Sequence, residues 1–275
     1  MIRYDKTLKV YYSTKINDAD VFSGFGTSDL GDGRDIENIK NFLKKTSKPY
    51  RQIVIPEQTH SANISVILND VKNPSRMRVE RRQAARSFVN TQDDKVLNIL
   101  NMDGLISQEA GCVLTIRTAD CAPIVYSDKK TGLYGISHQG WRGTFARLQS
   151  QMVKNFIDSG VNLENLTCAI GPAIGECCYE VGDDLYKQFF AEFSQYSKRV
   201  FNKRNGKWHL NLLLLNYLLL VDSGVNAKNI DFFPFCTKCN EEKFISARRM
   251  EKGDFPRQFN FIVKNDRITP RGQAV

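Results

Sequence analysis

The sequence predicts one α+β domain, and three observations support this fold class. Short apolar runs bounded by polar turns, such as VLTI, PIVYSD and LYGISH, are typical of buried strands. Runs with apolar residues at helical spacing alternate with them. No fixed-period repeat or low-complexity linker divides the 275 residues, of which 41% are apolar. A single domain over residues 1–275 with a substantial core is therefore expected.

The first 69 residues predict a strand, a glycine-rich turn, a helix and a further strand. The segments are, in order, LKVYYST, GFGTSDLGDGRD, IENIKNFLKK and QIVIPEQTHSANISVI. Gly24 and Gly26 are followed by no third glycine at the right place and by no immediate helix. A dinucleotide-binding Rossmann loop is therefore excluded.

Residues 70–95 are expected to form a polar, exposed insertion with a weak helical pattern. Four arginines lie close together there: Arg78, Arg81, Arg82 and Arg86. They could bind nucleic acid, but no aromatic platform or known binding motif accompanies them, so a solvated face is favoured. Nucleic acid is not an expected partner.

Strands and helices continue to alternate after Leu97. A helix through FARLQSQMVKNFIDSG ends at Gly160, and LTCAIGP, a helix through DDLYKQFFAEF, a helix over 211–223, FFPF and FNFIV follow. The stretch LNLLLLNYLLLV is shorter than the roughly 20 residues of a membrane span and contains two asparagines, so it predicts a core helix. The start of the chain lacks the apolar core of a secretory signal, and we expect a cytoplasmic protein.

Charge and histidine content narrow the possible ligands. The net charge of +9 favours anionic ligands such as phosphate or nucleotides, although solubility explains it equally well. There are only three histidines, and a blue-copper centre plus a trinuclear copper cluster needs many more imidazoles. A multicopper oxidase is therefore excluded.

Three residues could hold one metal ion. His60 and His138 stand at strand ends, where catalytic groups are often displayed, and Cys121 stands at a strand start. Two imidazoles and a thiolate suit zinc, with the fourth position left for water or substrate. Their spacing matches no compact zinc motif, so two core histidines and a buried thiol are an equally compatible interpretation.

Several charged residues near these three are candidates for catalysis or binding. Arg142 in GWRGT adjoins a helix start and could clamp phosphate or ribose. Arg248 is the first choice in the group that also contains Arg249 and Arg257. Asp120 could orient a ligand histidine or accept a proton, or it could cap its turn, and Asp103 has the same alternatives.

The remaining cysteines and His209 are expected to be structural. Cys112, Cys168, Cys177 and Cys178 are interpreted as packing residues. Cys236 and Cys239 form a single CTKC pair, which without a second pair favours a buried loop over another zinc site. His209 stands at a helix entry and is expected to have a structural role.

Seven blocks resemble one bacterial family. They are QTHSANI, NMDGLIS, TADCAPIVYSD, ISHQGWRGT, AIGPAIGECCYEVG, WHLNLLLLN and FISARRMEKGDFPRQ. They look like the YfiH-like proteins once called polyphenol oxidase or laccase-domain proteins and now described as purine nucleoside phosphorylases with adenosine deaminase activity. The similarity runs from about Gly24 to the C-terminus, apart from the insertion. The family commonly has alanines where Ser137 and Gln139 stand and an aspartate at Asn211, differences that concern substrate preference more than the metal.

The resemblance implies a YfiH-like fold of mixed β-sheets flanked by helices. It also implies that His60, Cys121 and His138 bind zinc, with copper as a possible substitute. The implied activity is a zinc-dependent purine nucleoside phosphorylase acting on adenosine, inosine, guanosine or methylthioadenosine, with adenosine deaminase activity. From the chemistry of the residues themselves, we expect Cys121, His138 and Asp120 to be catalytic and Arg142 and Arg248 to bind substrate. The partners would be a purine nucleoside and phosphate, and the protein would be a monomer that binds no membrane.

Two alternatives remain open. In the first, Cys121 is a nucleophile and His138 its base, and the protein is a metal-free hydrolase of an amide bond in a peptidoglycan precursor. In the second, the chain is a zinc-stabilised binding module with a basic surface. A structural zinc would need a fourth protein ligand, and none is evident beside the three.

Overall fold

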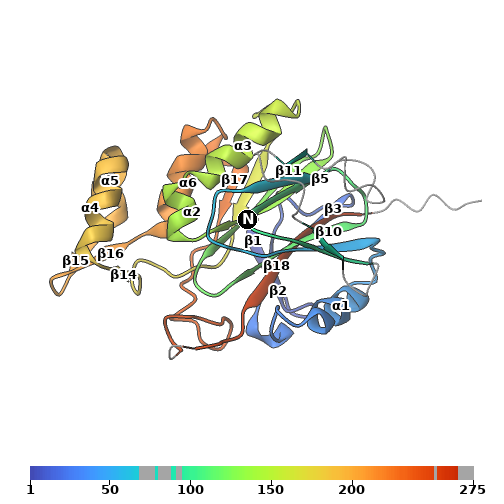
Figure 1. Ribbon diagram of the computed structural model, residues 1–275, viewed down its shortest axis with the longest axis horizontal. Coiled ribbons are helices and arrows are strands. Elements are labelled where there is room, and N and C mark those ends of the chain that lie inside the picture. The colour runs from blue at the N-terminus through green and yellow to red at the C-terminus, as the bar shows by residue number, and fades with distance from the viewer. Residues whose placement is uncertain (68–77, 80–87, 91–94, 251–252, 266–275) are drawn as a thin grey trace, which may run out of the picture.

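Two β-sheets pack face to face at the centre of the protein and are flanked by helices on both outer sides (Figure 1). The computed structural model describes residues 1–67, 78–79, 88–90, 95–250 and 253–265. The order of layers is helix, sheet, sheet, helix. The α+β class expected from the sequence is confirmed.

The larger sheet has the strand order β1-β2-β3-β18-β10-β4-β8-β7 within the described residues. Its strands are β1 (Ile2–Asp5), β2 (Val10–Ser13), β3 (Val21–Gly26), β4 (Gln52–Pro56), β7 (Phe88–Asn90), β8 (Val96–Ile99), β10 (Cys112–Thr118) and β18 (Gln258–Lys264). Most of its pairs are antiparallel, but β4 runs parallel to both β10 and β8. The sheet is therefore mixed.

The second sheet has the order β17-β13-β11-β12-β9-β5-β6 over the same part of the chain. Its strands are β5 (Ile64–Ile67), β6 (Arg78–Val79), β9 (Gly104–Ser107), β11 (Ala122–Asp128), β12 (Leu133–Gln139), β13 (Thr167–Ile170) and β17 (Ile230–Phe232). It is also mixed, because β5 is parallel to β9 and β13 is parallel to β17.

Helices cover the outer face of each sheet, and a small unit projects from one end (Figure 1). Helix α1 (Ile36–Lys45) packs on the larger sheet, and the second sheet is covered by α3 (Leu148–Asp158) and α6 (Leu212–Asp222). The short helix α2 (Trp141–Phe145) lies beside α6. The projecting unit consists of α4 (Asp183–Glu192), α5 (Ser194–Val200), β14 (Glu180–Val181), β15 (Phe201–Arg204) and β16 (Lys207–Leu210).

The layered arrangement explains the continuous apolar strands of the sequence. In β10, Val113 packs toward α1 while Leu114 packs between the two sheets. In β11, Ile124 and Tyr126 pack toward α3 and α6 while Val125 points to the sheet interface. Both faces of these strands are buried, so both must be apolar.

Helices expected over IENIKNFLKK and LNLLLLNYLLLV are confirmed as α1 and α6. The expected glycine-rich turn begins later than predicted, because Gly24 and Gly26 lie inside strand β3 and the turn starts only at Thr27. A Cβ atom on Gly24 would meet the Phe261 ring at 2.7 Å, so glycine there lets β3 lie close against β18. The segment around His209 is a strand, β16, rather than a helix entry.

The helix expected to begin near Gly143 is divided in two. Helix α2 ends at Phe145, and α3 begins at Leu148 after Arg147, whose φ of 56° lies in the left-handed region. Gly160 has φ 88° two residues after the end of α3, as its predicted role as a stop requires.

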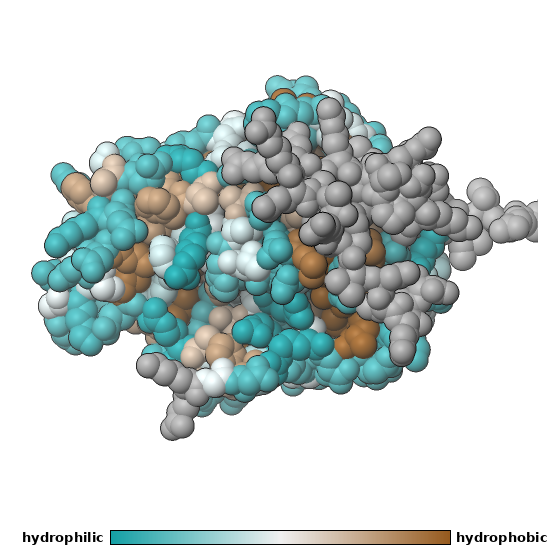
Figure 2. Space-filling model, viewed as in Figure 1, coloured by the Kyte–Doolittle hydropathy of each residue, from teal (hydrophilic) through white to brown (hydrophobic). Residues whose placement is uncertain are grey.

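The surface in Figure 2 is mostly hydrophilic where it is not drawn in grey, and its apolar residues form separate patches. Within the described residues, none of the helices combines the length and apolar character that a membrane crossing requires. The polar insertion expected at 70–95 lies mostly outside the described residues.

Candidate active site and metal centre

Strand register brings Cys121 and His138 to one edge of the second sheet. Strands β11 and β12 are antiparallel, with Pro123 opposite His138 and Ala122 opposite Gln139. Cys121 directly precedes β11, and His138 is the penultimate residue of β12. Residues 17 positions apart in sequence therefore become neighbours across the hairpin.

Asp103 reaches the same edge from the neighbouring strand. Strand β9 pairs with β12, with Gly104 opposite Ser137, and the backbone N–H of His138 donates to the Asp103 carbonyl oxygen at 2.8 Å. The Asp103 carboxylate is fully buried beneath the connection from β4 to β5. It accepts hydrogen bonds from the backbone N–H groups of Thr59 (3.2 Å), His60 (3.2 Å) and Ser61 (2.6 Å).

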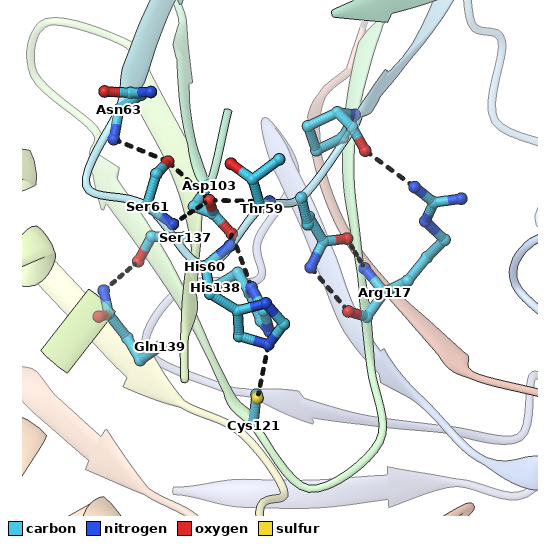
Figure 3. Close-up of polar contacts among 12 residues, drawn as sticks. Thr59, His60, Ser61, Asn63, Asp103, Arg117, Cys121, Ser137, His138 and Gln139 are labelled. Carbon is cyan, nitrogen blue, oxygen red and sulfur yellow. Dashed lines mark hydrogen bonds and ion pairs between the residues drawn. The ribbon is translucent and has the colours of Figure 1, made fainter. Parts of the chain in front are cut away.

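These bonds fix the turn that carries His60. His60 has φ 58°, a left-handed conformation that few non-glycine residues adopt. The Ser61 hydroxyl donates to Asp103 as well, at 2.7 Å, which holds the turn in place (Figure 3). The backbone at His60 is therefore strained and is maintained by one buried carboxylate.

The three candidate metal ligands converge. The ligand atoms of His60, Cys121 and His138, here called the histidine–cysteine triad, lie within 4.8 Å of one another. The His60 Nε2 atom is 3.9 Å from the Cys121 sulfur, and the centres of the two imidazole rings are 4.8 Å apart. Figure 3 shows the three side chains. Tetrahedral zinc bonds would hold such nitrogen and sulfur atoms roughly 3.3–3.6 Å apart, close to the observed spacing.

Asp103 also sets the orientation of His138. The Nδ1 atom of His138 is 2.8 Å from an Asp103 carboxylate oxygen, so Nε2 is left to face Cys121 and His60. Burial opposes ionisation of both groups, but the contact with His138 lowers the pKa of Asp103. A carboxylate behind a ligand histidine is a common support of zinc sites.

The Cys121 thiol is activated by the same neighbours. Burial would raise its pKa, but His138 and, less strongly, His60 lower the pKa of Cys121 to about 6. Burial also opposes the charge on His138, yet Cys121 and Asp103 together raise the pKa of His138 to about 9. A thiolate at neutral pH is the form that binds a metal or acts as a nucleophile.

Gly140 leaves the room that the triad needs. A Cβ atom there would lie 2.8 Å from the His60 ring and 3.1 Å from the Cys121 sulfur. The donor set, its spacing and its opening to a cavity fit a zinc ion with three protein ligands and one free position.

A cavity of about 450 Å³ adjoins the triad. Its volume falls in the usual range for small-molecule sites, roughly 300–1,000 Å³. Four of its lining residues, here called the cavity arginines, are Arg117, Arg142, Arg248 and Arg257. Its aromatic lining residues are Trp141, Tyr179 and Phe255. The wall thus combines positive charge with planar apolar surfaces.

The predicted binding arginines have distinct settings. The Arg142 guanidinium is exposed and lies over the Trp141 ring at 4.2 Å. The Arg248 guanidinium lies 5.0 Å from the Tyr179 ring centre and donates to the Glu180 carbonyl at 3.0 Å. Arg249 instead donates to the carbonyl oxygens of neighbouring loop residues and is absent from the described cavity wall.

Asp120 lines the cavity, but its carboxylate binds two loops rather than a histidine. It accepts hydrogen bonds from Thr237 (2.6 Å) and Ser246 (3.0 Å) hydroxyls and from the Arg248 backbone N–H (2.8 Å). Its φ of 88° is left-handed. The side chain therefore ties the residue before Cys121 to the segment that carries Arg248.

Sequence reasoning missed several cavity residues. Glu57, Gln58 and Arg117 lie on the wall. The Gln58 side-chain amide donates to the Arg117 carbonyl oxygen and accepts from the Arg117 backbone N–H, both at 2.8 Å (Figure 3). Arg117 is the penultimate residue of the apolar strand β10, and a charged residue in such a strand was the available signal. Ser137 and Gln139 bond each other at 2.9 Å and are not among the described residues of the cavity wall.

Known proteins resemble this chain over most of its length. Residues 26–265 match the family model described as multi-copper polyphenol oxidoreductase laccase. The adenosine deaminase RL5, from an unknown prokaryotic organism, is 34% identical over 199 residues, which is 72% of this chain and 70% of that protein. The purine nucleoside phosphorylase YlmD of Geobacillus stearothermophilus is 30% identical over 244 residues, 87% of this chain and 83% of that protein.

Solved structures show the same fold. The crystal structure of a Bacillus licheniformis hypothetical protein, YfiH, superposes with a TM-score of 0.79 at 27% identity, covering 95% of this chain and 98% of that one. YlmD from Geobacillus stearothermophilus superposes with a TM-score of 0.78 at 25% identity, covering 96% and 99%. The resemblance read from the motifs is therefore confirmed, and the chain belongs to the YfiH-like family of laccase-domain proteins, whose members include proteins named purine nucleoside phosphorylase and adenosine deaminase.

Proposed function

We propose that this chain is a zinc-dependent purine nucleoside phosphorylase that also deaminates adenosine. One observation carries the proposal: the histidine–cysteine triad opens into a cavity that has four arginines and three aromatic rings on its wall. The names of the relatives support the reaction class. The expected substrates are adenosine, inosine, guanosine and methylthioadenosine, with phosphate as the second reactant.

The triad would hold the zinc ion. Zinc supplies Lewis acidity, which makes an oxygen nucleophile available near neutral pH. Cys121 contributes a thiolate, because its pKa is lowered to about 6 by His138 and His60 against the opposing effect of burial. Asp103 holds His138 and the turn of His60 in the orientation that presents both rings to the same point.

The cavity arginines would bind phosphate. A guanidinium donates two parallel hydrogen bonds to an anion, and several in one cavity add their charge. Arg142 and Arg248 are the proposed contacts, and each is already placed against an aromatic ring. Trp141, Tyr179 and Phe255 offer planar surfaces on which a purine can stack.

Asp120 would act by positioning. Its bonds to Thr237, Ser246 and the Arg248 backbone hold Cys121 and Arg248 at a fixed separation. Phosphorolysis needs the attacking phosphate and the sugar in line, so a small displacement of Cys121 or Arg248 would lower the reaction rate.

The test is chromatography of adenosine incubated with zinc-loaded protein. We expect adenine and ribose 1-phosphate when phosphate is present and slower formation of inosine when it is absent. Both activities should fall together in His138→Ala, whereas Arg142→Ala should raise the KM for phosphate and keep the zinc. Adenosine, inosine and guanosine that all survive intact would refute the proposal.

A second function is favoured by a specific observation, the chain of contacts Cys121, His138 and Asp103. This order matches the nucleophile, base and orienting acid of a cysteine hydrolase. Such an enzyme would cleave an amide, as in a peptidoglycan precursor, without metal. Amide cleavage by zinc-free protein, abolished by added zinc, would identify it.

A further inference from the structure

Four cysteines from two separate loops converge beside the cavity. They are Cys177, Cys178, Cys236 and Cys239, here called the four-cysteine cluster. One loop follows β13 and the other follows β17, and these strands are parallel neighbours with Cys168 opposite Ile230. Both loops therefore leave the sheet at the same edge, and a bridge between Ala173 and Cys236 keeps them together.

We propose that the four-cysteine cluster binds a second, structural zinc ion. All four sulfur atoms lie within 4.8 Å of one another, and Cys239 is 3.5 Å from Cys177 and 3.4 Å from Cys178. Zinc bonds of about 2.3 Å to sulfur place sulfur atoms about 3.8 Å apart at the corners of a tetrahedron. Four protein thiolates complete the coordination shell, as in structural rather than catalytic zinc sites.

Packing does not explain this cluster. Cys112 and Cys168 are fully buried, as cysteines that serve as apolar core residues are. Cys177 and Cys239 are exposed, so the interpretation of Cys177 as a packing residue is wrong. Exposed thiols that face one another gain nothing from burial, but they are suitably placed to receive an ion.

The surrounding backbone is also shaped for sulfur ligands. Backbone N–H groups of Gly175, Lys238 and Cys239 donate to the Cys236 sulfur. N–H donors of this kind support thiolate ligands by stabilising their negative charge. A Cβ atom on Gly175 would lie 3.0 Å from the Cys236 Cβ and 3.3 Å from the Cys177 sulfur, so the backbone passes too close for a side chain.

The ion would support the cavity wall. The first loop carries Ile174 and Tyr179, and the segment after the second carries Arg248, all of which line the cavity. The loops otherwise share few direct bonds, such as Thr237 N–H to the Ala173 carbonyl at 3.0 Å. A tetrathiolate site would cross-link them.

The experiment measures zinc per chain in full-length protein purified anaerobically without added metal. We expect about two zinc ions per chain in the wild type and about one in Cys177→Ser/Cys239→Ser. His60→Ala/Cys121→Ala should also retain about one, which separates this inference from the proposed function. Cys168→Ala, outside both sites, is the matched control and should keep both ions. Retention of both ions by the Cys177→Ser/Cys239→Ser protein would overturn the proposal.

Two further measurements do not depend on how variants of the four-cysteine cluster fold. Cobalt added to zinc-depleted protein should give the intense sulfur-to-cobalt charge-transfer absorption of a tetrathiolate site, including when the triad is substituted. Alkylation mapped by mass spectrometry should spare the four-cysteine cluster until a chelator is added. Rapid alkylation in the presence of zinc, or disulfides among these residues in the anaerobic protein, would show that no ion is bound there.

Discussion

A single buried carboxylate organises the candidate site at the scale of one residue. Asp103 bonds the imidazole of His138 and the backbone of the turn at His60, so two of the three candidate metal ligands depend on it. Its position follows from the pairing of β9 with β12, which places Gly104 opposite Ser137. The sequence offered orientation of a ligand histidine as one of two alternatives for Asp103 and could not decide between them, because the partners lie 35 and 43 residues away.

Asp103→Asn is expected to weaken zinc binding by about 10- to 100-fold, the usual cost of losing the support of a ligand histidine. Asparagine keeps the size of the side chain but loses the negative charge that holds His138. The carboxylate also accepts four hydrogen bonds from the turn at His60, and an amide has only one oxygen to accept them. Competition with a chromophoric chelator measures the affinity. Asp128→Asn is the matched control, since Asp128 is equally buried and bonded, to Lys130 and Thr131 at the opposite end of the β11–β12 hairpin. Equal zinc affinities for the two variants would contradict the assignment.

The reactivity of Cys121 should report its electrostatic environment. Its pKa is lowered to about 6 by His138 and His60 although burial opposes this, so the thiolate predominates at neutral pH. In zinc-free protein, the alkylation rate of Cys121 should rise through about pH 6 and then level off. An ordinary thiol, with a pKa of roughly 8.5, would still be gaining reactivity above neutral pH.

The control for this profile is His138→Gln, which removes the group that lowers the pKa of Cys121 most. Its midpoint should move upward, because burial then acts with less opposition. Cys168 supplies an internal reference, since burial raises its pKa and hides it from reagent. An unchanged Cys121 midpoint in the variant would show that the imidazole does not activate the thiol.

At the scale of elements, α2 is positioned by α6. Helix α2 is too short to be stable alone and carries Trp141 and Arg142 to the cavity. Asn216 of α6 is fully buried and donates to the Thr144 hydroxyl at 3.0 Å and to the Leu212 carbonyl at 2.9 Å. This pair is the polar contact that holds α2 against an otherwise apolar helix.

Asn216→Leu should reduce the free energy of unfolding by about 1–3 kcal/mol, because it leaves the buried Thr144 hydroxyl without a partner. Thr144→Val removes the same hydrogen bond from the other side, because the Asn216 amide loses its acceptor. The double variant should therefore lose less free energy of unfolding than the sum of the two single losses. Denaturant titration of the four proteins gives a coupling energy of about 0.5–3 kcal/mol for residues in direct contact. Ser150→Ala, which removes a half-buried bond between α3 and α6, is the comparison and should cost less. Strict additivity would mean that the contact does not position α2.

Individual elements were predictable where local pattern decides them. α1 has an amphipathic pattern, and the Asp35 side chain at its start accepts from the Glu37 N–H. α6 is almost wholly apolar apart from Asn216 and its last residue, and the Asn211 side chain caps its start. The strands β10, β11 and β12 were identified by their apolar runs. The sequence could not show that Gly24 and Gly26 stand in a strand, since the reason is close approach to Phe261 and Phe259, more than 200 residues away.

The cavity exists only at the scale of the whole molecule. Its wall combines Gln58, Arg117, Arg142, Tyr179 and Arg257, which belong to five separate parts of the chain. Residue types predicted the triad because few side chains bind zinc. Among the arginines, Arg142, Arg248 and Arg257 were candidates from the sequence and line the cavity, whereas Arg249 does not and Arg117 was missed. Arginines are common on surfaces, so which of them converge depends on packing between distant layers.

Salt should weaken phosphate binding more than nucleoside binding. The chain carries a net charge of +9, and the cavity arginines concentrate part of it beside the triad. Added salt screens such attraction over a Debye length of about 10 Å at 0.1 M and about 3 Å at 1 M. The phosphate dianion loses this attraction, whereas neutral adenosine is held by stacking and hydrogen bonds.

The KM for phosphate should therefore rise several-fold as potassium chloride increases from about 0.05 to 0.5 M, while the KM for adenosine changes little. Arg117→Gln and Arg257→Gln should flatten the phosphate dependence, and Lys154→Gln, an exposed change on α3, should preserve it. A parallel rise in both KM values would instead point to a general effect of salt on the protein and would remove the cavity arginines from phosphate recognition.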